Sequence, residues 1–196
     1  YLPTIGIALA LVASTALQAD CPDAANNVPG CQLDSSADFG AFHLQDFSGL
    51  SSFDGLVGHA GPGSLAMAET TGGFVSIRGE CFTPSHPTTY RFGAYLRPAP
   101  PTVTSNCQVC LDLYSSPGCG AVDLVLCDIQ AAALDPGWTR FESAASMLGF
   151  VSAHLVVSCT ISDGGIVHVD DAFAGTLIFF DTFESNSTDT WSVVFL

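Results

Sequence analysis

FVSIRGECFTPSHPTTYRFGAYLR, residues 74–97, is the stretch that best indicates the fold. Apolar and polar residues alternate over 75–80 and again over 90–97, with a turn rich in proline between them. Period-two alternation of β-branched and aromatic residues predicts strands that bury one face. Pro84 and Pro87 supply turn chemistry and cannot continue a strand ladder. The side chains expected to face inward are Val75, Ile77, Gly79, Tyr90, Phe92, Ala94 and Leu96.

The same pattern of strands and turns continues along the chain at a spacing of about 8–12 residues, which is typical of sandwiches. No convincing long amphipathic helix follows residue 20. The expected fold class is therefore all-β, a two-sheet antiparallel jelly-roll sandwich with an apolar N-terminal segment. Further strands are expected at 64–68, 108–114, 122–128, 138–142, 151–160, 166–170 and 176–180, with short β segments around Phe39, Phe42, Leu44 and Phe47. Residues 108–114 and 122–128 are expected to form a hairpin, and strand 151–160 to turn Val151, Ala153, Leu155 and Val157 inward.

Composition suggests four regions in this order. Residues 1–19 are an apolar segment, 20–38 a polar linker with cysteines, 39–180 the sandwich, and 181–196 a C-terminal tail strand. A length of 196 residues fits one domain with tails, and 48% hydrophobic residues allow a large core.

The charge balance restricts the possible partners. Nineteen acidic residues face four arginines and no lysine, for a net charge of −15. Nucleic acid and anionic membrane surfaces would be repelled by this charge. On net charge alone acidic partners are excluded, whereas cations such as Ca²⁺ are attracted.

Eight cysteines, an even number, indicate an oxidising compartment and an exported protein. We expect all of them to form disulfides, although eight cysteines allow roughly 105 connectivities. Cys21 and Cys31 are the expected pair in the linker, and Cys119 with Cys127 would close the 108–128 hairpin. Residues three apart on a strand face opposite sides, so the C-x-x-C motif predicts structural disulfides rather than a metal or redox site. The expected disulfide cysteines are Cys21, Cys31, Cys81, Cys107, Cys110, Cys119, Cys127 and Cys159.

Residues 1–19, YLPTIGIALALVASTALQA, carry no charge and cannot remain exposed to water. One interpretation is the apolar core of a secretory signal, with small residues for cleavage; the absence of an initiator Met and of a basic leader fits it poorly. The other is a retained segment buried in a partner. As a helix it would be ~28 Å long. As a strand it alternates large and small residues, which suits strand complementation of a neighbouring subunit. The polymerisation residues would then be Ile5, Ile7, Leu9 and Leu11.

Five motifs occur in a familiar order: GSLAMA at 63–68, the 74–97 stretch, GWTRFE at 137–142, AHLVVSC at 153–159 and VHVDDAFAG at 167–175. Together they resemble the jelly-roll, galactose-binding-like carbohydrate-binding modules of exported bacterial proteins, over about residues 60–175. The FES…W pattern in the tail resembles the opening strand of the same family, and also a short tail that ends many exported proteins of Gram-negative bacteria. The resemblance implies two antiparallel sheets, a structural calcium in many members, and a sugar-binding face or loop rim. It also implies an extracellular or cell-surface location for a protein exported from a bacterium.

The resemblance suggests roles for particular residues. Asp170 and Asp171 match an acidic pair that often contributes a calcium ligand, and carboxylates suit this hard cation. In the alternative, one of them caps a turn and the other is solvated. Trp138 matches a core tryptophan, while Tyr95, Tyr114 and Phe74 are candidates for exposure, without an evident aromatic cluster.

No catalytic constellation is found, so we expect no enzyme and assign no catalytic residue. The histidines are scattered, although His154 and His168 lie on predicted strands and could approach each other. Two functions from different classes remain. The first is a subunit of an extracellular filament or surface assembly, a homopolymer joined through residues 1–19. The alternative is a secreted carbohydrate-binding or adhesive module with glycans as partners.

Overall fold

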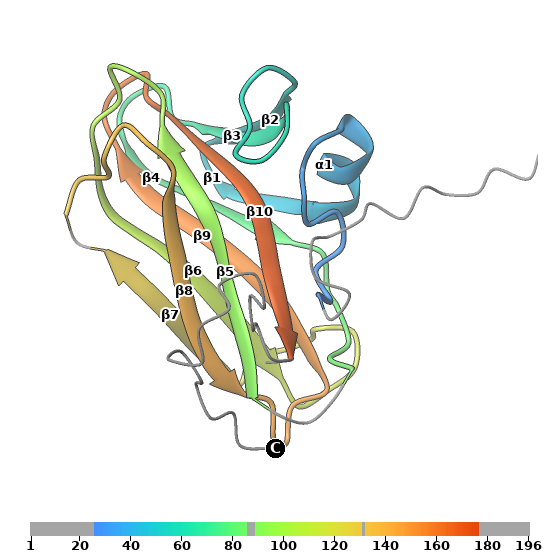
Figure 1. Cartoon of the computed structure of the whole chain (residues 1–196). Coiled ribbons are helices and arrows are strands. Elements are labelled where there is room, and N and C mark those ends of the chain that lie inside the picture. The colour runs from blue at the N-terminus through green and yellow to red at the C-terminus, as the bar shows by residue number, and fades with distance from the viewer. Residues whose placement is uncertain (1–25, 86–88, 131, 177–196) are drawn as a thin grey trace, which may run out of the picture.

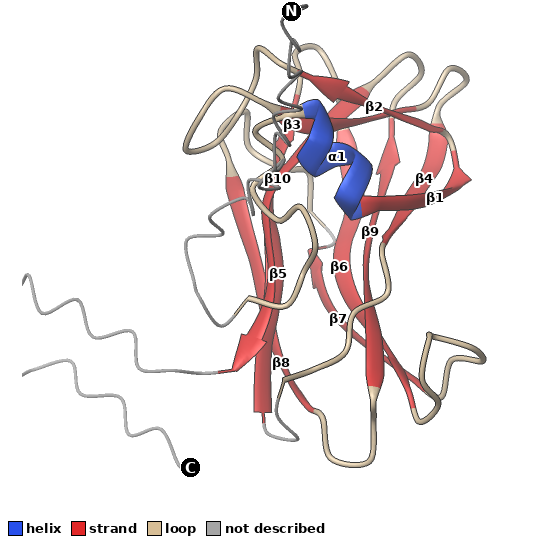
Figure 2. Cartoon of the chain, turned by 90° about the vertical axis from the view of Figure 1, so that its right-hand side faces the viewer, coloured by secondary structure: helices blue, strands red, loops and turns tan. Residues whose placement is uncertain are grey.

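The computed structural model describes residues 26–85, 89–130 and 132–176, and it arranges ten strands of this part in two antiparallel sheets. The first, named the β9 sheet after its central strand, contains β1 (His43–Ser48), β4 (Gly73–Gly79), β9 (Ser152–Ile161), β6 (Thr104–Tyr114) and β7 (Leu124–Gln130), in that order. The β10 sheet contains β2 (Leu50–Asp54), β3 (Ser64–Ala68), β10 (Ile166–Thr176), β5 (Thr89–Pro98) and β8 (Thr139–Ser146), in that order. The two sheets stack face to face around one apolar core (Figures 1 and 2). The expected all-β, two-sheet jelly-roll class is confirmed.

The stretch 74–97 supplies one strand to each sheet. β4 lies between β1 and β9, whereas β5 lies between β10 and β8, so the two strands do not pair with each other. Between them, Phe82 pairs with Ala153 of β9. The predicted inward side chains are confirmed: those of Val75, Ile77, Tyr90, Phe92, Ala94 and Leu96 are 0% exposed. The alternation therefore identified the buried face of two strands that meet different neighbours.

The hairpin prediction is also confirmed, because β6 and β7 pair in antiparallel register. β9 differs in detail from its prediction: Ala153, Leu155 and Val157 face the core, but Val151 precedes the strand and is 42% exposed. The strand predicted at 166–170 is longer than expected: β10 runs from Ile166 to Thr176 and contains a register shift between Asp170 and Phe173, where Asp171 has a φ of 44°. This bulge keeps the strand continuous while it redirects the side chains. Of the strand predicted at 176–180, residues 177–180 lie outside the described part of the chain.

The segment around Phe39 and Phe42 forms a helix, not the expected β segment. α1 spans Ser36–Phe42, and the Oγ atom of Ser35 caps it by accepting a hydrogen bond of 3.1 Å from the Asp38 backbone N–H. The i, i+3 spacing of the two phenylalanines suits one face of a helix, and Phe42 is fully buried. The chain then continues directly into β1 (Figure 2).

The described part of the predicted linker, residues 26–38, packs on the sandwich. Cys31 and Leu33 are 0% exposed. The Ala172 N–H donates to the Cys31 carbonyl at 2.7 Å, and the Asn27 N–H donates to the Ala174 carbonyl at 2.8 Å. These contacts join the segment to β10, so this part of the chain belongs to the folded domain.

Three disulfides connect described cysteines: Cys81–Cys119, Cys107–Cys159 and Cys110–Cys127. The expected Cys119–Cys127 pair is wrong, because Cys110 and Cys127 are direct cross-strand neighbours of β6 and β7. Cys31 is also disulfide-bonded, and no described cysteine is free. The predicted partner of Cys31, Cys21, lies outside the described residues.

Two further predictions fall outside the described part of the chain: the apolar segment with Ile5, Ile7, Leu9 and Leu11, and the tail strand 181–196. Among the described residues, no helix has the length and apolar character needed to span a membrane.

Candidate functional site

The outer surface of the β10 sheet, which is turned away from the core, carries the candidate site. On β5 the even-numbered residues from Tyr90 to Leu96 are buried, so the odd-numbered ones point outward. Register places Asp170, Tyr95 and Arg140 in one row across β10, β5 and β8. We call this surface the Tyr95 face, and it comprises His59, Arg91, Tyr95, Arg97, Trp138, Arg140, Glu142 and Phe173.

A glycine on β5 shapes the centre of the face. Gly93 lies opposite both Glu142 and Phe173 in the register. A Cβ atom on Gly93 would stand 2.6 Å from Cζ of Phe173, which is too close for any real contact. The absence of a side chain therefore lets the Phe173 ring lie against β5, beside Tyr95.

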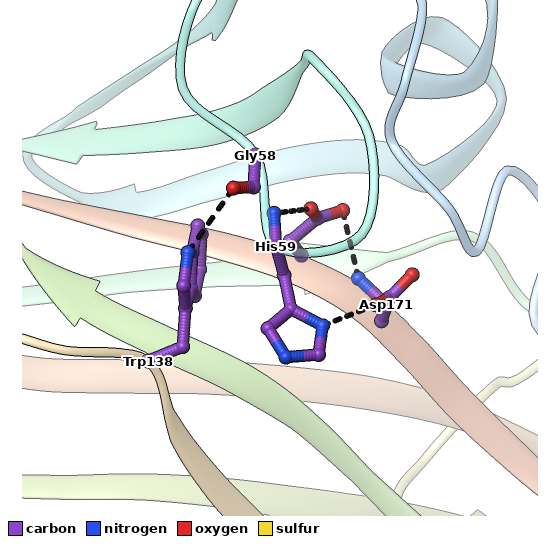
Figure 3. A network of polar contacts seen from close by, with 5 residues as sticks. Gly58, His59, Trp138 and Asp171 are labelled. Carbon is purple, nitrogen blue, oxygen red and sulfur yellow. Dashed lines mark hydrogen bonds and ion pairs between the residues drawn. The ribbon is translucent and has the colours of Figure 1, made fainter.

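The loop 55–63 crosses the sheet and brings His59 beside Trp138 (Figure 3), and an aromatic cluster forms there. The His59 ring stacks on Tyr95 with centroids 3.8 Å apart and an angle of 19° between planes. Trp138 meets the His59 ring edge-on at 5.7 Å, and its Nε1–H donates to the Gly58 carbonyl at 3.1 Å. The loop, β5 and the residue just before β8 thereby bring three rings together.

Two aspartates of β10 hold this loop down. The buried Asp170 carboxylate accepts the His59 N–H at 2.6 Å and the Asp171 N–H at 2.8 Å. Asp171 places its Oδ2 2.6 Å from Nδ1 of His59, as Figure 3 shows. The bulge at Asp171 makes both contacts possible, because it lets the carboxylates of two successive residues contact the same loop residue, His59.

The environment of Asp170 is unfavourable for negative charge. Burial is the main cause that raises the pKa of Asp170 to about 7; the charges of Asp171 and Asp34 act in the same direction, and the two N–H donors oppose them. The pKa of Asp34 is raised as well, first by burial and then by Asp171 and Asp38. Three carboxylates thus influence one another at this end of the sheet.

A cation would relieve this repulsion, and carboxylate oxygens are the ligands that Ca²⁺ prefers. However, both Asp170 oxygens already accept backbone N–H groups, and one Asp171 oxygen contacts His59. Within the described residues, the one group of three His, Cys, Asp or Glu ligand atoms lying within 4.8 Å of one another is Cys81, Cys119 and His154, and its two sulfurs are joined in a disulfide. The Asp170–Asp171 pair would need further ligands, so the calcium site stays a prediction.

Arginines dominate the rest of the face. Arg91 and Arg140 both pair with the Glu142 carboxylate, Arg140 at 2.6 Å. The Arg140 guanidinium also lies 5.9 Å from the Tyr95 ring centroid and 5.4 Å from that of Phe173, within range of cation–π attraction. Arg97 donates its Nε–H to the Pro136 carbonyl at 3.2 Å. Side chains with many N–H donors therefore surround the rings.

The four aromatic residues that the sequence singled out lie in different parts of the structure. Tyr95 lies at the site, and Trp138 is half-buried beside it rather than in the core. Tyr114 is 1% exposed and packs against His154. Phe74 is 49% exposed, but it lies on β4 of the other sheet. The cluster was missed because its rings come from three separate places: a loop, β5 and the residue just before β8.

The expected approach of two histidines is wrong. His154 lies on β9 and His168 on β10, in different sheets. Nδ1 of His154 is 2.8 Å from the Gly79 carbonyl oxygen, and Nδ1 of His168 is 3.1 Å from Oγ of Ser64. Burial lowers both pKa values, so each is a buried neutral histidine bound by its own sheet.

No family model and no curated protein matches the chain, but solved structures share its architecture. A xylan-binding domain of carbohydrate-binding module family 22 has a TM-score of 0.53 at 15% identity, over 80% of this chain and 100% of that one. The C-terminal family 22 module of Clostridium thermocellum Xyn10B has 0.53 at 13% identity, over 79% and 97%. This chain has the fold of carbohydrate-binding modules. It also matches part of an arabinose-bound MgGH51 α-L-arabinofuranosidase, with a TM-score of 0.52 at 15% identity, over 79% of this chain and 27% of that one. At these identities the likeness concerns the fold alone.

Proposed function

We propose that this protein is an exported module that binds glycans through the Tyr95 face. One observation carries the proposal: stacked aromatic rings lie on an outer sheet surface and are surrounded by side chains that can donate or accept hydrogen bonds. Aromatic rings can pack against the apolar C–H faces of sugar rings, while arginine and carboxylate groups bind hydroxyls. The fold shared with family 22 modules supports the same function.

The fixed geometry of the face suits binding. Hydrogen bonds to the carboxylates of Asp170 and Asp171 hold His59 over Tyr95, and the indole N–H of Trp138 donates to Gly58. A ligand would meet rings that are already in place, so little conformational entropy is lost on binding.

We also infer that the face binds without catalysis. Hydrolysis of a glycosidic bond usually needs two free carboxyl groups flanking the bond. Both oxygens of Glu142 are paired with arginines, and Asp170 is buried beneath the His59 loop. These carboxylates hold the face together and have no free position beside a ligand.

The disulfides favour an oxidising compartment, because such bonds persist mainly outside the cytosol. We propose an extracellular or cell-surface location and export from a bacterium. The filament role depends on residues 1–19, which are outside the described part, and no observation on the described residues favours it over glycan binding.

The test is a binding screen with a matched pair of aromatic variants. The purified protein is tested by affinity electrophoresis and calorimetry against xylans, galactans, glucans and mannans, together with their acidic counterparts. Tyr95→Ala should weaken the binding found at least tenfold, because it removes the central ring. Phe74→Ala removes an exposed ring from the other sheet and should bind like the wild type, with melting curves confirming that both variants fold. Wild-type binding to none of these glycans, or equal loss in both variants, would reject the proposal.

A further inference from the structure

The few positive charges of this chain are concentrated on one surface. Four arginines and no lysine stand against nineteen acids in the whole sequence. Three of the four, Arg91, Arg97 and Arg140, lie on the Tyr95 face, and the fourth, Arg78, lies on β4 of the other sheet. A strongly acidic chain therefore places most of its cationic side chains around one aromatic cluster.

The negative groups on this face compensate these charges only in part. Glu142 is shared between Arg91 and Arg140. Because both guanidinium groups contact Glu142, they lie close together, and burial and the charge of Arg140 lower the pKa of Arg91. Asp171 is engaged by His59, and Asp170 is buried beneath the loop. Two guanidinium groups therefore share one half-buried carboxylate.

Arg97 has no carboxylate partner within the described part of the chain. Its Nε–H donates to the Pro136 carbonyl. This hydrogen bond orients the guanidinium plane and leaves the terminal N–H groups to bind a ligand. Its register neighbour on β10 is the buried His168. Burial lowers the pKa of His168; the charge of Asp54 raises this pKa, and the charge of Arg97 lowers it. Asp54 lies 3.9 Å from Nδ1 of His168, on the far side of β10 from Arg97.

We infer that the glycan bound at the Tyr95 face carries carboxylate groups, as a uronic-acid polysaccharide does. A sugar ring would lie beside the His59–Tyr95–Trp138 cluster, and its carboxylate would take a two-pronged hydrogen bond from Arg97, the geometry that a planar guanidinium favours. This inference rests on the proposed function, because it names the substrate class of the same site.

The net charge of −15 led to the opposite expectation, that acidic partners are excluded. That expectation treats the charge as spread evenly over the molecule. At physiological ionic strength the Debye length is about 8 Å. Acids elsewhere on the surface are therefore screened, and the arginines in contact with the ligand decide the sign of the interaction.

The experiment compares acidic polysaccharides with their own carboxyl-reduced forms. Glucuronoxylan, polygalacturonate and alginate are each titrated into the full protein at about 0.15 M salt, beside a sample in which the uronate has been reduced to the neutral sugar. We expect at least one acidic form to bind tenfold or more tightly than its reduced counterpart. Dextran sulfate, which carries charge without carboxylates, should bind at least tenfold more weakly than that polymer.

Variants connect this preference to Arg97. Arg97→Gln should weaken binding of the acidic form at least tenfold and bring it close to that of the reduced form. Arg97→Lys, which keeps the charge but loses the planar fork, should restore only part of the affinity. Ala121→Asp, at an exposed loop position between β6 and β7, changes the net charge by the same amount as Arg97→Gln and should leave binding unchanged. If Arg97→Gln does not fold, Arg97→Lys and the reduced polymers still test the inference.

The possible failures are distinct. Equal binding of the acidic and reduced forms would overturn the carboxylate inference and leave glycan binding intact. Equal binding of dextran sulfate would also overturn it, because general charge would then suffice. Binding of no polysaccharide, acidic or neutral, would reject the inference and the proposed function together.

Discussion

Asp170 shows how one residue serves both the fold and the candidate site. Its carboxylate is 0% exposed, yet it accepts the backbone N–H of His59, which holds the loop, and the backbone N–H of Asp171 on its own strand. A buried carboxylate is costly to ionise even when N–H groups point at it. The loop that carries His59 therefore depends on a group whose charge the protein poorly tolerates.

The stability of the protein should depend on the titration of Asp170. The pKa is about 7 in the folded state against 3.8 for the ordinary group, so the folded protein binds this proton more tightly than the unfolded chain. This contribution is fully present below pH 4 and is lost as the pH rises to about 7, by on the order of 2–4 kcal/mol. Urea unfolding in chelator from pH 4 to 8 should show this fall in the wild type, and Asp170→Asn should reduce it. Parallel curves for the two proteins would show that Asp170 does not carry the effect.

Calcium binding at Asp170 and Asp171 is tested by melting. If Ca²⁺ binds the folded state there, added calcium raises the melting temperature and chelator lowers it, by mass action. Asp171→Ala should melt low and show no response to calcium. An unchanged wild-type melting curve in chelator would reject the site, and Asp170 with Asp171 would then act only as the anchors of the loop.

At the scale of the elements, the candidate site depends on how closely β10, β5 and β8 approach. The Asp171 bulge on β10 moves Phe173 into register with Gly93, where only a glycine leaves room for the ring. Arg140 then lies over both Phe173 and Tyr95. A bulge on one strand and a glycine on the next thus build one surface.

Gly93→Ala should destabilise the domain. The added Cβ would meet the Phe173 ring and the Phe141 backbone, and only the ring can move away. Overpacking of this kind costs roughly 1–3 kcal/mol. Gly137→Ala is the control, since a Cβ added there would have no neighbour within 4 Å and its backbone requires no positive φ. Similar urea midpoints for the two variants would contradict the assigned role of Gly93.

At the scale of the whole molecule, disulfides connect elements distant in the sequence. Cys107–Cys159 joins β6 to β9 across 52 residues, and Cys81–Cys119 joins the loop after β4 to the β6–β7 loop across 38. By the loop-entropy model, such links contribute roughly 3–4 kcal/mol each by restricting the unfolded chain.

We expect every cysteine to be oxidised in the exported protein. A thiol reagent added to the denatured, unreduced chain should detect no free thiol. Reduction should then expose all eight and lower the melting temperature. Two or more thiols per chain before reduction would contradict the predicted pairing of the full set.

The pattern of residues along the chain was enough to predict the fold class and most of the strands. Alternation in 74–97 identified the buried side chains of β4 and β5, because a strand that buries one face imposes a period of two on its residues. The same alternation left Arg91, Tyr95 and Arg97 on the opposite side of β5, so part of the candidate face was already visible in the pattern. Local spacing also predicted the β6–β7 hairpin, whose register depends on its own turn.

Local patterns could not predict which sheet each strand joins, which cysteines pair and which side chains of different elements meet. Cys119 is eight residues from Cys127 in sequence but bonds Cys81, because cross-strand register makes Cys110 the neighbour of Cys127. His59, Tyr95 and Trp138 are separated by dozens of residues and meet only because a loop crosses the sheet. Periodicity reports which side of an element is buried, whereas a site built from several elements depends on long-range contacts that no local pattern encodes.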